Sequence, residues 1–304
     1  MPAQTIELRA ADGRLLGGAF TPPAGAVRGA VVIAGANGVP HRFYAGTAEA
    51  LAGLGLAVLR FDYRGLGASR TLPPRREPAS MRDWGALDVA AAIEWLAERV
   101  PDRPLHLLGH SAGGWLAGFA GNTSRLASIV TVASQSGYWR LWPWPERALI
   151  AAFWFAVLPA TVGVFGYLPR IVLGGGESLP PRAARQWARW GRSPDFLGAD
   201  ATPGFAAFRG RLLALAVVGD DFYAPRASVE RFAGFYTAVA TREVRDFGPR
   251  SADGRTPRHF TAFASAFRPA LTGVLGGFLL DEKETAAGMI PAAVEAMPSG
   301  SSGS

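Results

Sequence analysis

Apolar and polar residues alternate along this 304-residue chain in blocks that predict strands and helices in turn. Short runs of apolar and β-branched residues are typical of strands buried on both faces, and apolar spacings of three and four are typical of covering helices. Strands are expected at residues 5–9, 15–20, 29–34, 56–61, 105–109, 126–133, 212–218 and 242–247. Helices are expected at residues 43–54, 81–100, 115–120, 229–238 and 260–280. This order predicts an α/β fold with a mostly parallel, eight-stranded sheet and helices on both faces.

The alternation stops at residues 136–201, which are rich in Trp, Phe, Pro and Gly. Because long loops without regular structure are uncommon in compact domains, we expect an inserted helical cap there. Residues 1–135 and 202–281 would then form the core. Residues 282–304 are expected to be a flexible tail, and their Ser- and Gly-rich end is typical of an artificial linker.

One stretch of the expected cap, residues 148–168, has no charged residue and is long enough to span a bilayer. Arg147 and Arg170 flank it. A single crossing here would place the strands before it and the strands after it on opposite sides of a membrane. Pro159 stands near its middle and is expected to break a helix. We therefore expect cap helices folded onto the core, with peripheral membrane contact as the remaining alternative.

Composition narrows the partners and the location. The formal charge is +7, but Lys283 is the only lysine and the arginines are scattered, so a nucleic-acid partner is not expected. The chain has no cysteine, which excludes disulfides, thiolate metal sites and cysteine nucleophiles. Residues 1–10 are polar and have no apolar signal core, which favours a cytoplasmic location.

A serine between glycines ends the fifth expected strand. Residues 105–114 read Leu-His-Leu-Leu-Gly-His-Ser-Ala-Gly-Gly, so Gly109, Ser111 and Gly113 form a Gly-x-Ser-x-Gly pattern. In such a turn from strand to helix the serine hydroxyl is exposed above the sheet, and a Cβ on either glycine would collide with strand or helix. A small-residue turn that arose by chance is the alternative. A nucleophilic role requires a base and an orienting acid elsewhere in the chain.

Only four histidines could supply the base. His106 lies inside a strand, His110 lies in the turn itself, and nothing after His41 would orient that ring. His259 follows the last expected strand and precedes the final helix. Active sites of parallel sheets form at the carboxyl ends of strands, so His259 is the candidate that falls beside Ser111.

The acid is expected after the seventh strand, where residues 217–225 read Val-Val-Gly-Asp-Asp-Phe-Tyr-Ala-Pro. Neighbouring residues at a strand end point in opposite directions, so only one of Asp220 and Asp221 can reach His259. The order serine, aspartate, histidine differs from the orders of the two common serine-protease folds.

Over residues 4–281 the chain resembles the α/β-hydrolase family, near its serine-aminopeptidase-like and monoacylglycerol-lipase-like bacterial members. The stretches that carry this resemblance are Gly-Ala-Asn-Gly-Val at 35–39, Phe-Asp-Tyr-Arg-Gly-Leu-Gly at 61–67, Ser-Gly-Tyr-Trp at 136–139, Gln-Trp-Ala-Arg-Trp at 186–190 and Asp-Asp-Phe-Tyr-Ala-Pro at 220–225. The resemblance implies Ser111 as nucleophile and His259 as base. It also implies Asp221 as acid, because the family acid commonly stands four residues before a proline, here Pro225. The oxyanion hole would consist of the backbone N–H groups of Ala36 and Ala112.

These residues predict a serine hydrolase that acts through an acyl-enzyme on a small-molecule acyl substrate. No metal or organic cofactor is expected, because no ligand cluster or complete phosphate-binding glycine pattern is present. The aromatic residues of the cap favour carboxylic esters with an apolar acyl group. They are Trp139, Trp142, Trp144, Phe153, Trp154, Phe155 and Phe165. An amidase or aminopeptidase, or a non-catalytic binding protein that keeps the fold, are the alternatives.

Overall fold

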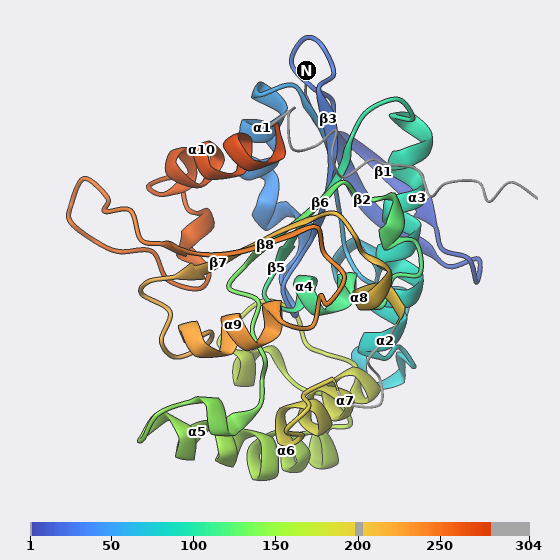
Figure 1. The fold of residues 1–304 in the computed structure, drawn as a ribbon. Helices are drawn as coiled ribbons and strands as arrows, with labels where there is room; N and C mark the ends of the chain where they lie inside the picture. Colours follow the sequence, from blue (N-terminus) through green and yellow to red (C-terminus); the bar gives the residue numbers. More distant parts are fainter. Residues whose placement is uncertain (1, 198–202, 281–304) are drawn as a thin grey trace, which may run out of the picture.

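The computed structural model describes residues 2–197 and 203–280. Its centre is one eight-stranded sheet in the order β1-β2-β4-β3-β5-β6-β7-β8 (Figure 1). The strands are β1 (Gln4–Arg9), β2 (Leu15–Thr21), β3 (Gly29–Ala34), β4 (Leu56–Phe61), β5 (Leu105–His110), β6 (Ser128–Val132), β7 (Arg211–Val217) and β8 (Thr241–Phe247). Strand β2 pairs antiparallel with β1 and β4, and all other pairs are parallel. The predicted α/β class, strand number and mostly parallel pairing are confirmed.

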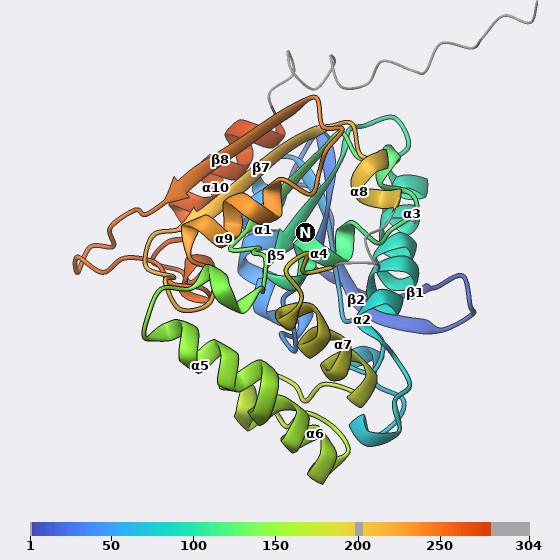
Figure 2. The same ribbon diagram turned by 60° about the horizontal axis from the view of Figure 1, so that its bottom comes forward.

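Helices cover both faces of the sheet. Helices α1 and α10 pack against each other on one face, and α3, α4 and α9 lie on the other (Figures 1 and 2). The core helices are α1 (Ala45–Gly53), α2 (Met81–Asp83), the π-helical η4 (Trp84–Val89), α3 (Ala90–Arg99), α4 (Ala112–Ala117), α8 (Pro203–Ala207), α9 (Arg226–Ala233) and α10 (Arg268–Leu279). Every residue of β3, β4, β5, β6 and β7 is buried, because helices shield both of their faces.

Residues 136–197, which follow β6, form a layer of helices at one end of the molecule (Figures 1 and 2). Its elements are η6 (Trp139–Leu141), α5 (Glu146–Ala152), the π-helical η7 (Phe153–Val157), α6 (Leu158–Phe165), η8 (Arg170–Leu173) and α7 (Pro181–Arg192). We call residues 136–197 the cap. Its division from the core stays a prediction, and the boundary expected near residue 201 lies outside the described residues.

The expected break at Pro159 is wrong, because one continuous helix runs from Glu146 to Phe165 through α5, η7 and α6. Proline lacks an N–H and its ring presses on the carbonyl of the preceding turn. The wider π-helical turns of η7 end just before Pro159, which is the second residue of α6. Such turns accommodate an interruption in the hydrogen-bond ladder without ending the helix.

Candidate active site

Ser111 occupies a strained turn between β5 and α4. Its backbone angles, φ 50° and ψ −115°, lie in a region that residues other than glycine rarely adopt. Hydrogen bonds hold this backbone: the Ser111 N–H donates to Val132 O at 2.9 Å, and Ser111 O accepts from the Gly114 N–H at 3.1 Å. The residue is 7% exposed. The turn therefore presents a serine at the carboxyl end of the central strand while fixing its backbone.

The flanking glycines are required by close approach. A Cβ on Gly109 would lie 2.7 Å from Gly114 N, and a Cβ on Gly113 would lie 2.0 Å from Ala34 O. Both distances are shorter than any real contact of a methyl carbon, so each substitution would push the helix away from the sheet. The collision expected from the sequence is thus present at both positions.

His259 pairs with Asp220, and the expected contact with Asp221 is wrong. The Nδ1 atom of His259 lies 2.5 Å from Oδ2 of Asp220. Both residues are buried, whereas Asp221 is exposed. The two aspartates do point in opposite directions, but the turn after β7 directs the first of them inward. The spacing to Pro225 was therefore a misleading signal for this chain.

The loop that carries His259 is held against the end of β7. The Gly219 N–H donates to Pro257 O at 3.2 Å, and a Cβ on Gly219 would lie 2.4 Å from that same oxygen. The second carboxylate oxygen of Asp220 accepts the Tyr223 N–H at 3.2 Å. The His259 ring packs against two aromatic rings, with its centroid 4.9 Å from that of Tyr223 and 4.8 Å from that of Phe260. These contacts fix where the imidazole lies and which way it faces.

The backbone N–H of Ala36 is already engaged. It donates to the buried Tyr44 hydroxyl at 2.9 Å, which conflicts with its expected role as a free oxyanion donor. Ala112 is the first residue of α4, where a backbone N–H has no partner within its own helix. The next amide in the β3 loop is that of Asn37, which has no acceptor among the described residues. The Asn37 N–H is thus an unengaged amide next to the one that was expected to serve as donor.

Tyr44 connects this loop to the serine turn. Its hydroxyl lies 2.8 Å from Nδ1 of His110, and Nε2 of His110 lies 3.1 Å from the backbone oxygen of His259. That carbonyl can only accept, so Nε2 carries a proton. Burial lowers the pKa of His110 well below its usual range, so the ring is neutral and its Nδ1 must accept from Tyr44. The donation therefore runs from Ala36 to Tyr44 and from Tyr44 to His110, while His110 also donates to the His259 backbone.

The remaining two histidines are held elsewhere. Nδ1 of His41 lies 2.8 Å from an Arg60 nitrogen, which can only donate, and the His41 N–H donates to Asp62 at 2.6 Å. His106 is fully buried and its Nδ1 lies 2.8 Å from the Ser128 hydroxyl. Burial lowers the pKa of His106 to about 3, so this ring is neutral at physiological pH. Neither ring contacts His259 or Asp220.

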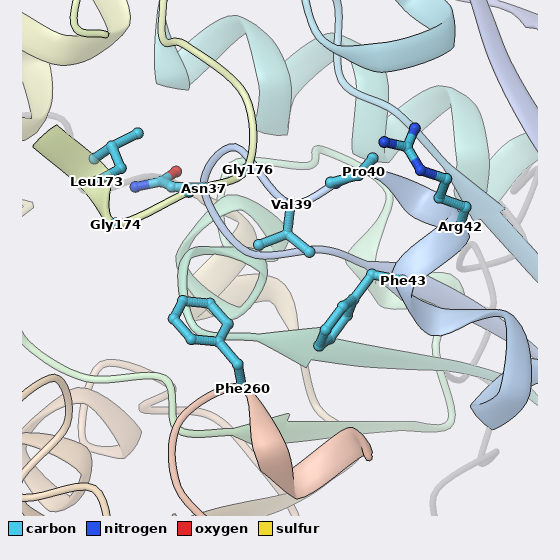
Figure 3. A pocket seen from close by; sticks show the side chains of 10 residues that line it. Asn37, Val39, Pro40, Arg42, Phe43, Leu173, Gly174, Gly176 and Phe260 are labelled. Carbon is cyan, nitrogen blue, oxygen red and sulfur yellow. The ribbon is translucent and has the colours of Figure 1, made fainter. Parts of the chain in front are cut away.

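A pocket of about 370 Å³ is lined by Phe260, the residue that follows His259, whereas His259 and Ser111 themselves do not line it (Figure 3). Figure 3 shows Phe260 and Phe43 facing each other below Val39, with Asn37 and Leu173 on the opposite side. The remaining lining residues are Pro40, Arg42, Gly174, Gly175 and Gly176. The lining is therefore mostly apolar, and the amide oxygen of Asn37 is buried without a partner.

The aromatic cap residues expected to form an acyl pocket do not line this one. Trp142 and Trp154 are buried, and their indole N–H groups donate to Phe222 O at 2.7 Å and to Gly137 O at 3.1 Å. Trp144, Phe155 and Phe165 are exposed. The described pocket is instead built by the β3 loop, by η8 with the glycines after it, and by the residue that follows His259.

Sequence reasoning missed three residues of this arrangement. Asp220 had an equal neighbour in Asp221, and Asn37 had an equal neighbour in Ala36. Tyr44 had no signal, because it bonds to a residue 66 positions away. Among the described residues, no group of three or more His, Asp or Glu side chains is arranged to hold a metal ion.

Comparisons with known proteins agree with the fold described above. The family model described as the alpha/beta hydrolase fold matches residues 31–162. Over 91% of this chain and 90% of the other, the structure superposes on a Pyrococcus furiosus esterase with a TM-score of 0.60 and 16% identity. A soluble variant of the Saccharomyces cerevisiae monoglyceride lipase, solved with a substrate analogue, gives a TM-score of 0.62 and 15% identity over 92% and 96%. At such identities these similarities show the fold.

Sequence relatives match only in part. An uncharacterised Mycobacterium tuberculosis protein is 34% identical over 121 residues, which cover 38% of this chain and 41% of that protein. A Danio rerio lysophosphatidylserine lipase is 34% identical over 84 residues, which cover 28% of this chain and 20% of that protein. The chain thus matches less than half the length of these curated relatives.

Proposed function

Because the chain is an α/β-hydrolase-fold protein with hydrolases among its structural neighbours, we propose that it is a serine hydrolase that cleaves carboxylic esters through an acyl-enzyme. One observation carries the proposal: a buried His259–Asp220 pair at 2.5 Å is joined, through the backbone oxygen of His259, to His110, the residue before a serine held in a strained turn. The strained turn is the arrangement that exposes a nucleophile, and the pair is the arrangement that turns a ring nitrogen into a base.

The proposed steps follow from the hydrogen-bond directions. The Asp220 carboxylate can only accept, so Nδ1 of His259 carries a proton and Nε2 is left to take the proton of Ser111. Ser111 Oγ then attacks the ester carbonyl, and the Ala112 and Asn37 N–H groups stabilise the oxyanion. His259 passes the proton to the leaving alcohol, and water releases the acid by the reverse sequence.

The ester's acyl group is proposed to be apolar, and the pocket beside His259 supports this. Val39, Phe43, Leu173 and Phe260 offer it an apolar surface, and burial of each methylene stabilises a complex by about 0.8 kcal/mol. In this proposal the substrate is a small molecule that fits between the β3 loop and η8.

Labelling with a fluorophosphonate tests the nucleophile. The purified chain should be labelled, Ser111→Ala should not, and Ser124→Ala, which removes an exposed serine, should be labelled as fast as the parent. An unlabelled parent protein would favour a non-catalytic binding role. If labelling succeeds, a panel of acyl esters and aminoacyl amides separates the proposed esterase from an amidase or aminopeptidase, and turnover of the amides alone would contradict the ester proposal.

A further inference from the structure

The helix from Glu146 to Phe165 is the largest apolar feature that the proposed chemistry does not use. The most apolar 18-residue window of this helix has a mean hydropathy of 2.1, and only 17% of that window is buried. Trp154, Leu158 and Val162 are buried and stand four residues apart, so a single stripe faces the rest of the cap. A core helix of a folded protein would bury most of such a surface.

The rest of this helix and its flanks expose large apolar side chains. Val164 is 79% exposed and Ile171 is 83% exposed. We call the whole set the cap face: Trp144, Leu149, Phe155, Val157, Val164, Phe165 and Ile171. It holds half of the fourteen exposed large hydrophobic residues in the described part of the chain. Single exposed apolar residues are ordinary, but seven of them within residues 144–171 indicate a surface that binds something.

The cap carries a net positive charge. Residues 136–197 contain seven arginines and three acidic residues, a formal charge of +4 out of +7 for the whole chain. Arg140 stacks over Trp139 at 4.9 Å, and Arg192 lies over the Phe155 ring at 5.8 Å. Arg75 of the core lies against Gly166 at the end of α6. Aromatic and arginine side chains around an apolar centre suit the boundary between lipid tails and anionic headgroups.

Both ends of the helix are tied to the core on the same side. Before it, the Trp142 indole donates to Phe222 O at 2.7 Å. After it, Leu168 pairs with Leu179, and the Glu177 N–H donates to Gly38 O at 2.7 Å. A helix whose two ends return to one folded body cannot cross a bilayer without dismantling these contacts. The apolar surface is thus available to a membrane only from outside.

We propose that the cap face docks on an anionic lipid bilayer, with the helix lying in the plane of the interface. The exposed apolar side chains enter the boundary of the acyl chains, and the arginines meet the anionic headgroups. Leu173, two residues after Ile171, lines the pocket beside His259, so docking brings the mouth of that pocket to the lipid. The docking does not depend on catalysis and is measured without it.

The test is flotation of the full chain with vesicles of phosphatidylcholine alone or mixed with phosphatidylglycerol. The parent should float with the mixed vesicles, bind less at high salt, and be released by carbonate. The double variant Leu149→Ser, Val164→Ser should bind the vesicles more than tenfold more weakly. The control variant Leu15→Ser, Leu72→Ser, at exposed positions outside the cap, should bind as the parent does. Arg170→Gln should lower binding about fivefold and the matched Arg103→Gln should not.

Other occupants give other results, and each would overturn the proposal. Equal binding to neutral and anionic vesicles would remove the role of charge, and resistance to carbonate would indicate a spanning helix. A dimer that the Leu149→Ser, Val164→Ser variant converts to a monomer would assign the cap face to a second copy. Binding that appears only when the chain ends at Leu280 would assign it to the chain's own end. Because all substituted side chains are exposed, we expect every variant to fold as the parent does, and circular dichroism checks this.

Discussion

Replacing Asp220 by asparagine tests the hydrogen-bond directions on which the proposed chemistry depends. In the parent, Oδ2 of Asp220 accepts from Nδ1 of His259 and Oδ1 accepts from the Tyr223 N–H. The Tyr223 N–H can only donate, so an asparagine in this buried place must keep its oxygen there. Its NH2 group then faces Nδ1 of His259, which becomes an acceptor, and the ring proton moves to Nε2.

That change of tautomer removes the base. With a proton on Nε2, His259 cannot accept the proton of Ser111, although every heavy atom stays in place. We expect kcat to fall by about four orders of magnitude, which corresponds to about 5 kcal/mol in the activation barrier. KM should change little, because Asp220 is 3% exposed and does not line the pocket.

The assay is the initial rate of hydrolysis of p-nitrophenyl butyrate. Asp221→Asn is the matched control: its side chain is exposed, and we expect a change of less than about twofold, as for ordinary surface substitutions. Equal losses in the two variants, or a larger loss for Asp221→Asn, would refute the assignment of Asp220 as the acid.

Three further predictions use other parts of the structure. Tyr44→Phe leaves the Ala36 N–H and His110 Nδ1 buried without partners and should lower the free energy of unfolding by about 2–4 kcal/mol in chemical denaturation, whereas exposed Tyr223→Phe should change it little. Lengthening a p-nitrophenyl ester by four carbons from the acetate should raise kcat/KM roughly a hundredfold if the apolar pocket holds the acyl group, and a steady fall from acetate onward would contradict it. Because burial lowers the pKa of His106 from 6.5 to about 3, the unfolded chain binds a proton there that the native chain does not. This contribution to stability is complete above about pH 6.5 and is lost as the pH falls toward 3. Between about pH 7.5 and about pH 5.5 its loss lowers the free energy of unfolding by about 1 kcal/mol, and His106→Gln should remove this part of the pH dependence.

The sheet could be predicted because buried parallel strands leave an unambiguous pattern. Runs such as Gly29–Ala34 and Leu56–Phe61 contain almost no residue that would suit a solvated face, and helices of matching length separate them. Helix limits were less certain. The last helix begins at Arg268 instead of residue 260, because residues 261–263 form a separate 3₁₀ turn and Pro269 stands in the first turn of the helix.

The active-site details could not be predicted, because they are set by contacts between distant segments. Nothing local distinguishes Asp220 from Asp221; the choice depends on how residue 219 is held by Pro257 from another loop. The continuity of the cap helix was missed for a different reason. A proline normally ends a helix, and the sequence gives no sign of the π-helical turns that accommodate Pro159.

The bonds around His110 also explain how the proposed base could be held firmly and still move its proton. His110 anchors the backbone of His259 through the carbonyl, and Asp220 orients the ring through Nδ1. Neither contact uses Nε2, so the atom proposed to accept and then return a proton is not needed to hold the ring in place. The Ser111 backbone is fixed in the same way, through its N–H and carbonyl, which leaves Oγ free. Hydrogen bonds to backbone atoms and to one ring nitrogen thus fix the two residues. The two atoms proposed to react, Ser111 Oγ and His259 Nε2, take no part in these bonds.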